Sequence, residues 1–296
     1  MEKVKDLYPD TPPTVLRNRD EKFRTAKNIW FWHAIADFVF WRMFKFRFFS
    51  ALIKGEENFK KLDPRFATIF CSPHTNWWDG ALNYILRMRF MKGYKFRLMI
   101  EEMNRFPLFQ YIGCFPINKR TAQTAMKSLQ YCASMFEDPK VTYWFFPQGI
   151  IRPPGYRPIE FQSGLAYLVQ HAAKNYGGIN LVTVSSKYCF LREDKPEVVV
   201  RVYEPVVITN ADFDRKEFTK KYEAEFETLC DNHEHEISSG NFEGYSYVFK
   251  RKLSWWKVIE KKLKNIGMKN AEAGVKRPTC KERSEGEPPR VAAKNN

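Results

Sequence analysis

Short apolar runs alternate with longer runs of helical periodicity between about residues 56 and 208. β-branched and aromatic residues dominate the short runs, which predict strands at residues 66–71, 96–100, 141–146, 179–184 and 198–203. The longer runs predict helices at residues 81–86, 121–136 and 164–174, the last of them ended by Gly177-Gly178. Strands that alternate with helices predict an α/β fold, a mostly parallel central sheet flanked by helices.

The segments on either side of this core have a different pattern. Residues 28–54 carry aromatic or aliphatic side chains on nearly every side, which predicts one or two helices that contact both protein and lipid headgroups. A buried core helix with an unusually aromatic face is the alternative. After residue 210, Phe218, Tyr222, Phe226 and Leu229 recur at helical spacing and predict a helix that packs beyond the sheet.

The pattern therefore divides the chain into four regions. We expect an N-terminal arm and membrane-interface helices over residues 1–55, the α/β domain over residues 56–210, and a C-terminal helical extension over residues 211–268. This extension includes a basic, tryptophan-containing helix at residues 250–264. Residues 269–296 are polar and rich in charge, which predicts a disordered tail.

Charge and composition narrow the choice of partner. The formal net charge of +15 favours anionic partners, which are nucleic acid, an acidic membrane surface or a phosphate-bearing substrate. The 26 Phe and 8 Trp, many of them beside Lys or Arg, favour the membrane interface. Nucleic-acid binding has little support because the sequence contains no glycine-rich phosphate loop, RNA-binding aromatic motif or zinc-finger spacing.

The chain also lacks the sequence signals of membrane insertion. No segment approaches the roughly 20 apolar residues that a spanning helix requires. The first residues have no apolar signal core. These observations predict a peripheral or monotopic membrane protein, one that lies on the bilayer rather than crossing it.

The six cysteines give no pattern of metal binding. None forms a C-x-x-C pair, and most lie in apolar surroundings, so we expect buried free thiols in a reducing cytosol. No metal site is expected.

His74 and Asp79 form the first candidate site. Two side chains five residues apart in a helix lie about 140° apart around its axis, so they cannot meet within one. They can meet if His74 precedes the helix, Asp79 lies in its first turn, and Thr75 or Asn76 acts as N-cap. Asp79 would then hold one ring nitrogen while the other faces a substrate hydroxyl, the arrangement of a general base. The alternative is a capping carboxylate beside an incidental histidine.

Two further segments place cations and glycine after strands. Residues 113–120 end on Lys119 and Arg120, which suit a phosphate group. Residues 146–155 run from a strand into a turn that contains Gly149, which lets the backbone approach a ligand, and Arg152. Solvated cations at ordinary strand ends are the alternative for both.

In order and spacing, these segments resemble the glycerolipid acyltransferase family, whose best-known members acylate lysophosphatidic acid to phosphatidic acid. The family carries an H-x4-D block, a G-x-F-x-I-x-R-like block, F-P-E-G-T-R and a Val-rich strand. The corresponding segments here are residues 74–79, 113–120, 146–152 and 181–184. Residues 161–166 also resemble the family, and the likeness covers residues 60 to 205.

The resemblance implies a direct acyl transfer. His74 would act as general base on the acceptor hydroxyl, and Asp79 would orient it. The implied substrate-binding residues are Lys119, Arg120, Gln148, Gly149 and Arg152. The implied partners are an anionic membrane surface on the cytoplasmic face, a lipid acceptor, and acyl-CoA or acyl carrier protein as co-substrate, with no cofactor.

Three positions depart from the family pattern. Gln148 stands where the family has Glu, Ile150 where it has Thr, and Thr183 where it has Pro. Because Gln148 lacks the charge, the acceptor assignment weakens and another lipid alcohol, such as a carotenoid glycoside or another glycolipid, is an alternative. A non-catalytic membrane-binding relative is a further one.

Overall fold

The computed structural model describes residues 23–101, 103–119, 121–191, 193–252, 258–259 and 262–263. Described residues up to Lys250 belong to one compact unit, and those from Arg251 onward belong to a second. In the second unit, residues 258–259 and 262–263 are helical. The predicted N-terminal arm up to residue 22, most of the predicted basic helix and the predicted tail lie outside the described residues.

In the described part of the chain, nine strands form one sheet with the order β4-β3-β5-β2-β6-β7-β1-β9, and β8 pairs with β6. The strands are β1 (Ser50–Lys54), β2 (Thr68–Cys71), β3 (Lys95–Ile100), β4 (Cys114–Pro116), β5 (Val141–Phe145), β6 (Ile179–Cys189), β7 (Glu197–Val202), β8 (Val206–Ile208) and β9 (Ser246–Lys250). Strands β4, β3, β5, β2 and β6 pair in parallel, and so do β1 and β7. The pairings of β6 with β7 and β8, and of β1 with β9, are antiparallel. The predicted mostly parallel α/β sheet is therefore confirmed.

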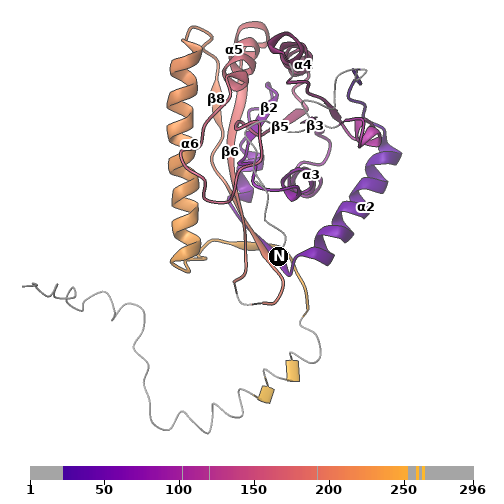
Figure 1. The fold of residues 1–296 in the computed structure, drawn as a ribbon, viewed down its shortest axis with the longest axis vertical. Helices are drawn as coiled ribbons and strands as arrows, with labels where there is room; N and C mark the ends of the chain where they lie inside the picture. Colours follow the sequence, from indigo (N-terminus) through magenta and orange to yellow (C-terminus); the bar gives the residue numbers. More distant parts are fainter. Residues whose placement is uncertain are drawn as a thin grey trace, which may run out of the picture. The chain divides into compact units, whose positions relative to one another are not determined.

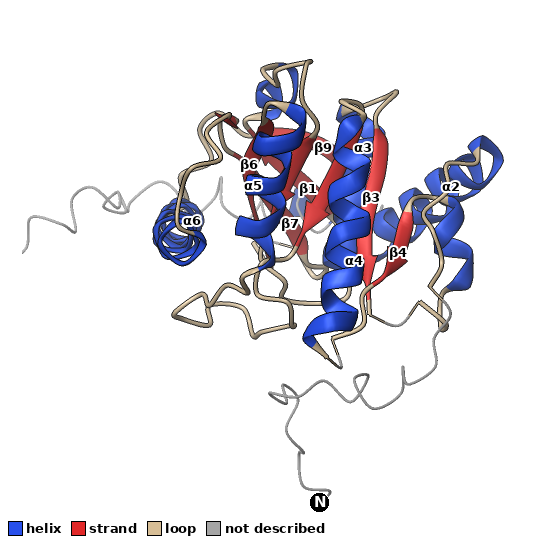
Figure 2. Cartoon of the chain, turned by 90° about the horizontal axis from the view of Figure 1, so that it is seen from above, coloured by secondary structure: helices blue, strands red, loops and turns tan. Residues whose placement is uncertain are grey.

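Helices cover both faces of this sheet (Figure 1). They are α2 (Trp30–Arg47), α3 (Trp78–Phe90), α4 (Ala122–Ser134), α5 (Gly164–Tyr176) and α6 (Arg215–Ser238), with short 3-10 turns η1 (Glu56–Lys60), η2 (Pro107–Tyr111) and η3 (Met135–Glu137). Side chains of β2 alternate between the faces: Phe70 packs in a core with α2 and α3, whereas Ile69 and Cys71 pack in a second core with α4, α5 and α6. Figure 2 shows α4 and α5 side by side on the second face.

The N-terminal aromatic segment corrects one prediction. Residues 28–54 contain one helix, α2, as predicted, but the segment ends in the strand β1, which the sequence pattern did not predict. β1 pairs with β7 on one side and β9 on the other, and these ladders satisfy its backbone groups. Among the residues of α2, Phe40 and Phe44 are buried, and several large apolar side chains of the helix are exposed.

Other element boundaries also differ from the predicted ones. β6 continues to Cys189, beyond the predicted end at residue 184, because β7 pairs with its second half. Lys250 ends β9 and does not begin a helix. No helix among the described residues is both long and apolar enough to span a membrane.

Candidate active site

The loop between β2 and α3 carries His74 at the carboxyl edge of the parallel strands. β2 and β5 pair in register with Cys71 opposite Phe145, so the chain leaves both strands at the same edge. The backbone N–H of Ser72 donates to the Phe145 carbonyl at 3.0 Å, which keeps the two exits together. Residues that follow neighbouring parallel strands gather at such an edge, where α/β folds bind ligands.

The His74 ring and the Asp79 carboxylate are in contact. Nδ1 of His74 lies 3.0 Å from Oδ2 of Asp79, and the backbone N–H groups of Thr75 and Asn76 donate to the same oxygen at 2.6 and 2.9 Å. Because this oxygen accepts, Nδ1 carries the ring proton and Nε2 is the basic nitrogen. The Asp79 side chain is 2% exposed and that of His74 is 21% exposed.

The helix start differs slightly from the predicted capping. α3 begins at Trp78, and its N-cap residue is Trp77, which makes no side-chain cap hydrogen bond. Asn76, one position earlier, accepts from the Trp78 backbone N–H at 2.7 Å through its side-chain oxygen. Asp79 lies in the first turn, as predicted, where the helix dipole favours a negative charge.

The segment after β5 holds His74 from three sides. The Phe146 ring stacks on the imidazole, with centroids 4.1 Å apart and an interplanar angle of 11°. The buried Gln148 side chain accepts from the His74 backbone N–H at 2.9 Å, and the Arg152 backbone N–H donates to the His74 carbonyl at 2.9 Å. The Gln148 oxygen thus fixes the backbone of His74, a contact that no local sequence pattern predicts. A role for Gln148 in substrate binding stays a prediction.

Lys119 lies at the same edge, and its ammonium group has protein partners. It contacts the Glu101 carboxylate at 3.1 Å and donates to the carbonyl of Gly149. Glu101 follows β3, the neighbour of both β4 and β5, and so lies at the same edge of the sheet. Lys119 therefore connects the second and third sequence blocks, and its role in phosphate binding stays a prediction.

Glycine is required at two positions of these blocks. A Cβ on Gly113 would lie 1.9 Å from the Phe96 carbonyl oxygen, at a φ of +102°. Gly149 has a φ of +71°, a conformation that residues with a side chain adopt at a cost in energy. The first glycine lets the turn before β4 approach β3 closely, and the second shapes the turn that supports His74.

Of the two remaining predicted cations, Arg152 and Arg120, the structure describes only Arg152. Arg152 is half-buried, and its guanidinium lies over the Tyr156 ring at 4.7 Å. Arg120 lies outside the described residues. The structure thus brings His74, Asp79, Lys119, Gln148, Gly149 and Arg152 into one loop cluster, and their chemical roles stay predictions.

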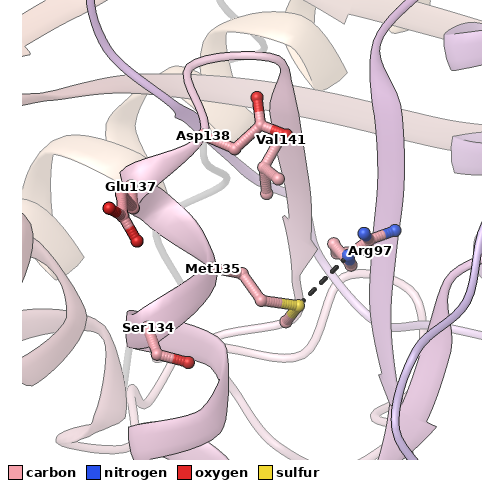
Figure 3. A pocket seen from close by; sticks show the side chains of 6 residues that line it. All are labelled: Arg97, Ser134, Met135, Glu137, Asp138 and Val141. Carbon is pink, nitrogen blue, oxygen red and sulfur yellow. Dashed lines mark hydrogen bonds between the residues drawn. The ribbon is translucent and has the colours of Figure 1, made fainter.

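Two other polar groupings lie away from this cluster. A cavity of about 270 Å³ is lined by Arg97, Ser134, Met135, Glu137, Asp138 and Val141, and Val141 begins β5 at the end opposite the site (Figure 3). The buried His233 ring contacts the Ser185 hydroxyl at 2.7 Å. Burial lowers the pKa of His233 to about 3, so the ring is neutral at pH 7.

No group of three or more His, Cys, Asp or Glu side chains that could hold a metal ion occurs among the described residues.

Comparisons with known proteins give a family match for the segment that carries this cluster. Residues 51–187 match the family model described as Acyltransferase. One similar solved structure is the 1-acyl-sn-glycerophosphate (LPA) acyltransferase PlsC from Thermotoga maritima. It is 18% identical, the match covers 70% of this chain and 80% of that chain, and the TM-score is 0.47. No curated protein sequence matches the chain.

Proposed function

We propose that this chain, whose residues 51–187 match the Acyltransferase family model, transfers a fatty acyl group from an acyl thioester to the hydroxyl of a lipid at a membrane surface. The observation that carries the proposal is the contact between Nδ1 of His74 and the buried Asp79 carboxylate, at 3.0 Å. It leaves Nε2 of a partly exposed ring as the basic atom, which is what deprotonation of an alcohol requires.

In the proposed reaction, His74 acts twice. Nε2 takes the proton of the acceptor hydroxyl as its oxygen forms a bond to the thioester carbonyl carbon. The tetrahedral intermediate then expels the thiolate, which receives the proton back from Nε2, so the products are an ester and a free thiol. Asp79 accepts the hydrogen bond of the Nδ1–H group throughout and stabilises the imidazolium that forms between the two steps. Phe146 and Gln148 hold the ring and its backbone, which reduces the motion that must be frozen in the transition state.

Lysophosphatidic acid is the acceptor that we propose first. Arg152, and Arg120 in the second sequence block, are the cations assigned to its phosphate, because guanidinium binds phosphate through paired hydrogen bonds. A neutral lipid alcohol, such as a carotenoid glycoside or another glycolipid, is the second candidate. It is favoured by Gln148 in place of Glu and by the protein partners of the Lys119 ammonium group. The donor is acyl-CoA or acyl carrier protein.

The exposed face of α2 supports the proposed membrane surface. Trp30, Phe38 and Phe46 are 80%, 68% and 76% exposed, and the last turn of the helix carries Lys45 and Arg47. Exposed aromatic side chains beside cations are typical of a helix that lies in the interface of an anionic bilayer.

The buried side of α2 packs against the start of α3, next to the loop of His74. The buried Phe44 of α2 contacts Trp78 with ring centroids 6.1 Å apart, and Trp77, three residues after His74, is 49% exposed. Trp77 is therefore an exposed aromatic side chain close to His74, which we propose as a second membrane contact. The free thiols of the buried cysteines support a reducing compartment, so the cytoplasmic face is the side that we propose.

One assay tests the reaction and the acceptor together. Purified protein is incubated with a labelled acyl-CoA, or with the corresponding acyl carrier protein, and a total lipid extract. Free thiol is measured, and the labelled product is identified by mass. We expect thiol release that depends on added lipid and a product heavier than one lipid by one acyl group. Absence of acceptor-dependent thiol release with both donors would overturn the proposed function.

Vesicle sedimentation tests the membrane surface separately. Replacement of Phe38 and Phe46 by Asp should weaken binding to vesicles that contain phosphatidylglycerol by ten-fold or more, on the order expected for two lost apolar anchors. The matched control is Val206→Asp on the edge strand β8, where the native side chain is also exposed, at 51%. Equal binding by the α2 variant and the control would remove α2 from the membrane contact.

A further inference from the structure

The second half of β6 brings the side chain of Tyr188 close to the first turn of α3, which contains Asp79. Thr183 of β6 lies opposite Cys71, the last residue of β2, so residues 184–189 run beyond the end of β2 toward the loop of His74. Three alternate side chains of β6 contact α6: Thr183 contacts Tyr222, Ser185 contacts His233, and Lys187 contacts Glu234. Because side chains alternate along a strand, Tyr188 faces the opposite side of the sheet, where α3 packs.

Ring contacts place Tyr188 beside the first turn of α3. The Phe48 ring lies 5.6 Å from the Tyr188 ring and 5.3 Å from Trp78, the residue before Asp79. Burial, followed by the nearby Asp79 carboxylate, raises the pKa of Tyr188 well above its usual value. The phenol therefore stays protonated in the physiological range and is available as a hydrogen-bond donor toward that carboxylate.

Two buried oxygen atoms in this region, one on Asp79 and one on Tyr188, have unused hydrogen-bonding capacity. Oδ2 of Asp79 accepts from the His74 ring and from two backbone N–H groups. Oδ1 of Asp79 and the Tyr188 hydroxyl are both buried, and neither has a hydrogen-bond partner among the described residues. A buried polar atom without a partner is destabilising, so a donor and an acceptor left over at one place are expected to satisfy each other.

We propose that Tyr188 is a positioning residue of the active site, whose hydroxyl donates to Oδ1 of Asp79 and holds the carboxylate with Oδ2 toward Nδ1 of His74. This inference rests on the proposed function for its kinetic consequence, but the contact itself does not depend on it. With Oδ1 held, the carboxylate resists rotation about its Cβ–Cγ bond, and the proton of the imidazole stays on Nδ1. Without that bond, the carboxylate gains freedom and the tautomer that leaves Nε2 basic is less strongly selected.

The test compares two Tyr→Phe variants. Tyr188→Phe removes the proposed donor. The matched control, Tyr143→Phe, also removes a buried hydroxyl without a partner among the described residues, but from β5 on the opposite face of the sheet. We expect Tyr188→Phe to lower kcat about ten-fold with KM values for both substrates unchanged, the order of one hydrogen bond to a charged group. Tyr143→Phe should leave kcat within about two-fold of the wild type, since single effects away from the site are small.

A spectroscopic measurement makes the outcome independent of turnover. In protein with ¹⁵N-labelled histidine, the ring nitrogen shifts of His74 should report the Nδ1-protonated tautomer in the wild type and in Tyr143→Phe, and a mixture of tautomers in Tyr188→Phe. Unchanged His74 shifts in Tyr188→Phe would overturn the inference, whether or not kcat falls. If the shifts change as expected while the wild type releases no thiol with any acceptor, the contact stands and the proposed function fails.

Discussion

Gln148 accepts a hydrogen bond from the backbone N–H of His74 at 2.9 Å, across 74 positions of sequence. The same segment stacks Phe146 on the His74 ring and donates the Arg152 N–H to the His74 carbonyl. The histidine is therefore held by two loops, its own after β2 and the one after β5. This arrangement restricts the imidazole independently of Asp79.

Replacement of Gln148 should separate this positioning from charge. Gln148→Ala leaves the His74 N–H without its acceptor, and we expect a loss of about 1–2 kcal/mol in the free energy of unfolding and a roughly ten-fold fall in kcat. Gln148→Glu keeps an oxygen at the same place and should stay within a few-fold of the wild type. Urea unfolding and initial rates measure both effects. Equal loss of activity in the two variants would show that the oxygen is not what matters.

Asp79→Asn tests the second restraint on the ring. The amide has the shape of the carboxylate but no charge, and it can present an N–H where His74 needs an acceptor. We expect kcat to fall by about a hundred-fold or more, in line with the loss seen when the orienting carboxylate of a catalytic triad becomes an amide. Circular dichroism and urea unfolding serve as controls for folding. A fall of less than about three-fold would mean that Asp79 acts only as a helix cap.

Substitutions of Lys119 and Arg152 should differ in how their effect on the kinetics depends on the acceptor lipid. Because the Lys119 ammonium group joins Glu101 to the Gly149 carbonyl, Lys119→Met should lower kcat/KM by similar factors for a phosphate-bearing and for a neutral lipid acceptor. Arg152→Met should raise KM about ten-fold for the phosphate-bearing acceptor alone, the order expected for one lost charge-assisted hydrogen bond. Parallel KM measurements decide between the two patterns. A loss in Lys119→Met that is confined to phosphate-bearing acceptors would assign Lys119 to the substrate instead.

The free energy of unfolding should fall as the pH falls, because His233 is buried as a neutral ring. Burial holds the pKa of this ring at about 3, below the value of 6.5 for an exposed histidine, so the unfolded chain binds a proton that the folded one rejects. This group therefore does not change the free energy of unfolding above about pH 6.5. As the pH falls from 6.5 toward 3, it lowers the free energy of unfolding. The slope of the free energy of unfolding against pH approaches about 1.4 kcal/mol per pH unit for this one group.

A variant isolates that contribution. His33, whose pKa burial lowers to about 4, acts in the same direction, so the wild type should lose stability faster than one histidine alone predicts. His233→Gln should reduce the slope of unfolding free energy between pH 6 and pH 4 by about 1.4 kcal/mol per unit. Urea titrations at several pH values measure it. An unchanged slope would mean that His233 is protonated in the folded protein.

The sequence predicted the parts of the structure that depend on local pattern. The strands around residues 66–71 and 141–146, the helix that follows His74, and the meeting of His74 with Asp79 all follow from periodicity and from the geometry of a helix start. The aromatic and aliphatic run that ends in β1 has no clear period, so its pattern predicts a helix. Only the pairing of β1 with β7 and β9 identifies it as a strand.

The contacts that complete the site were beyond prediction for a different reason. Gln148 and Lys119 are polar residues in loops, and the direction of such side chains depends on which loops the fold brings together. Nothing in the residues next to Gln148 indicates that its oxygen faces a backbone N–H of His74. Tyr188 lies in the part of β6 that the predicted strand did not include, so the alternation that places it could not be applied.

His74→Ala provides the most direct measurement of the central claim, that the Nε2 atom of this ring removes the proton of a lipid hydroxyl during acyl transfer. The rate of acylated lipid formation is compared between wild type and variant at saturating acyl-CoA and acceptor, with unfolding curves to confirm equal folding. We expect a fall of about 10⁴-fold, the upper range for loss of a general base. A folded His74→Ala protein that forms product at the wild-type rate would contradict it.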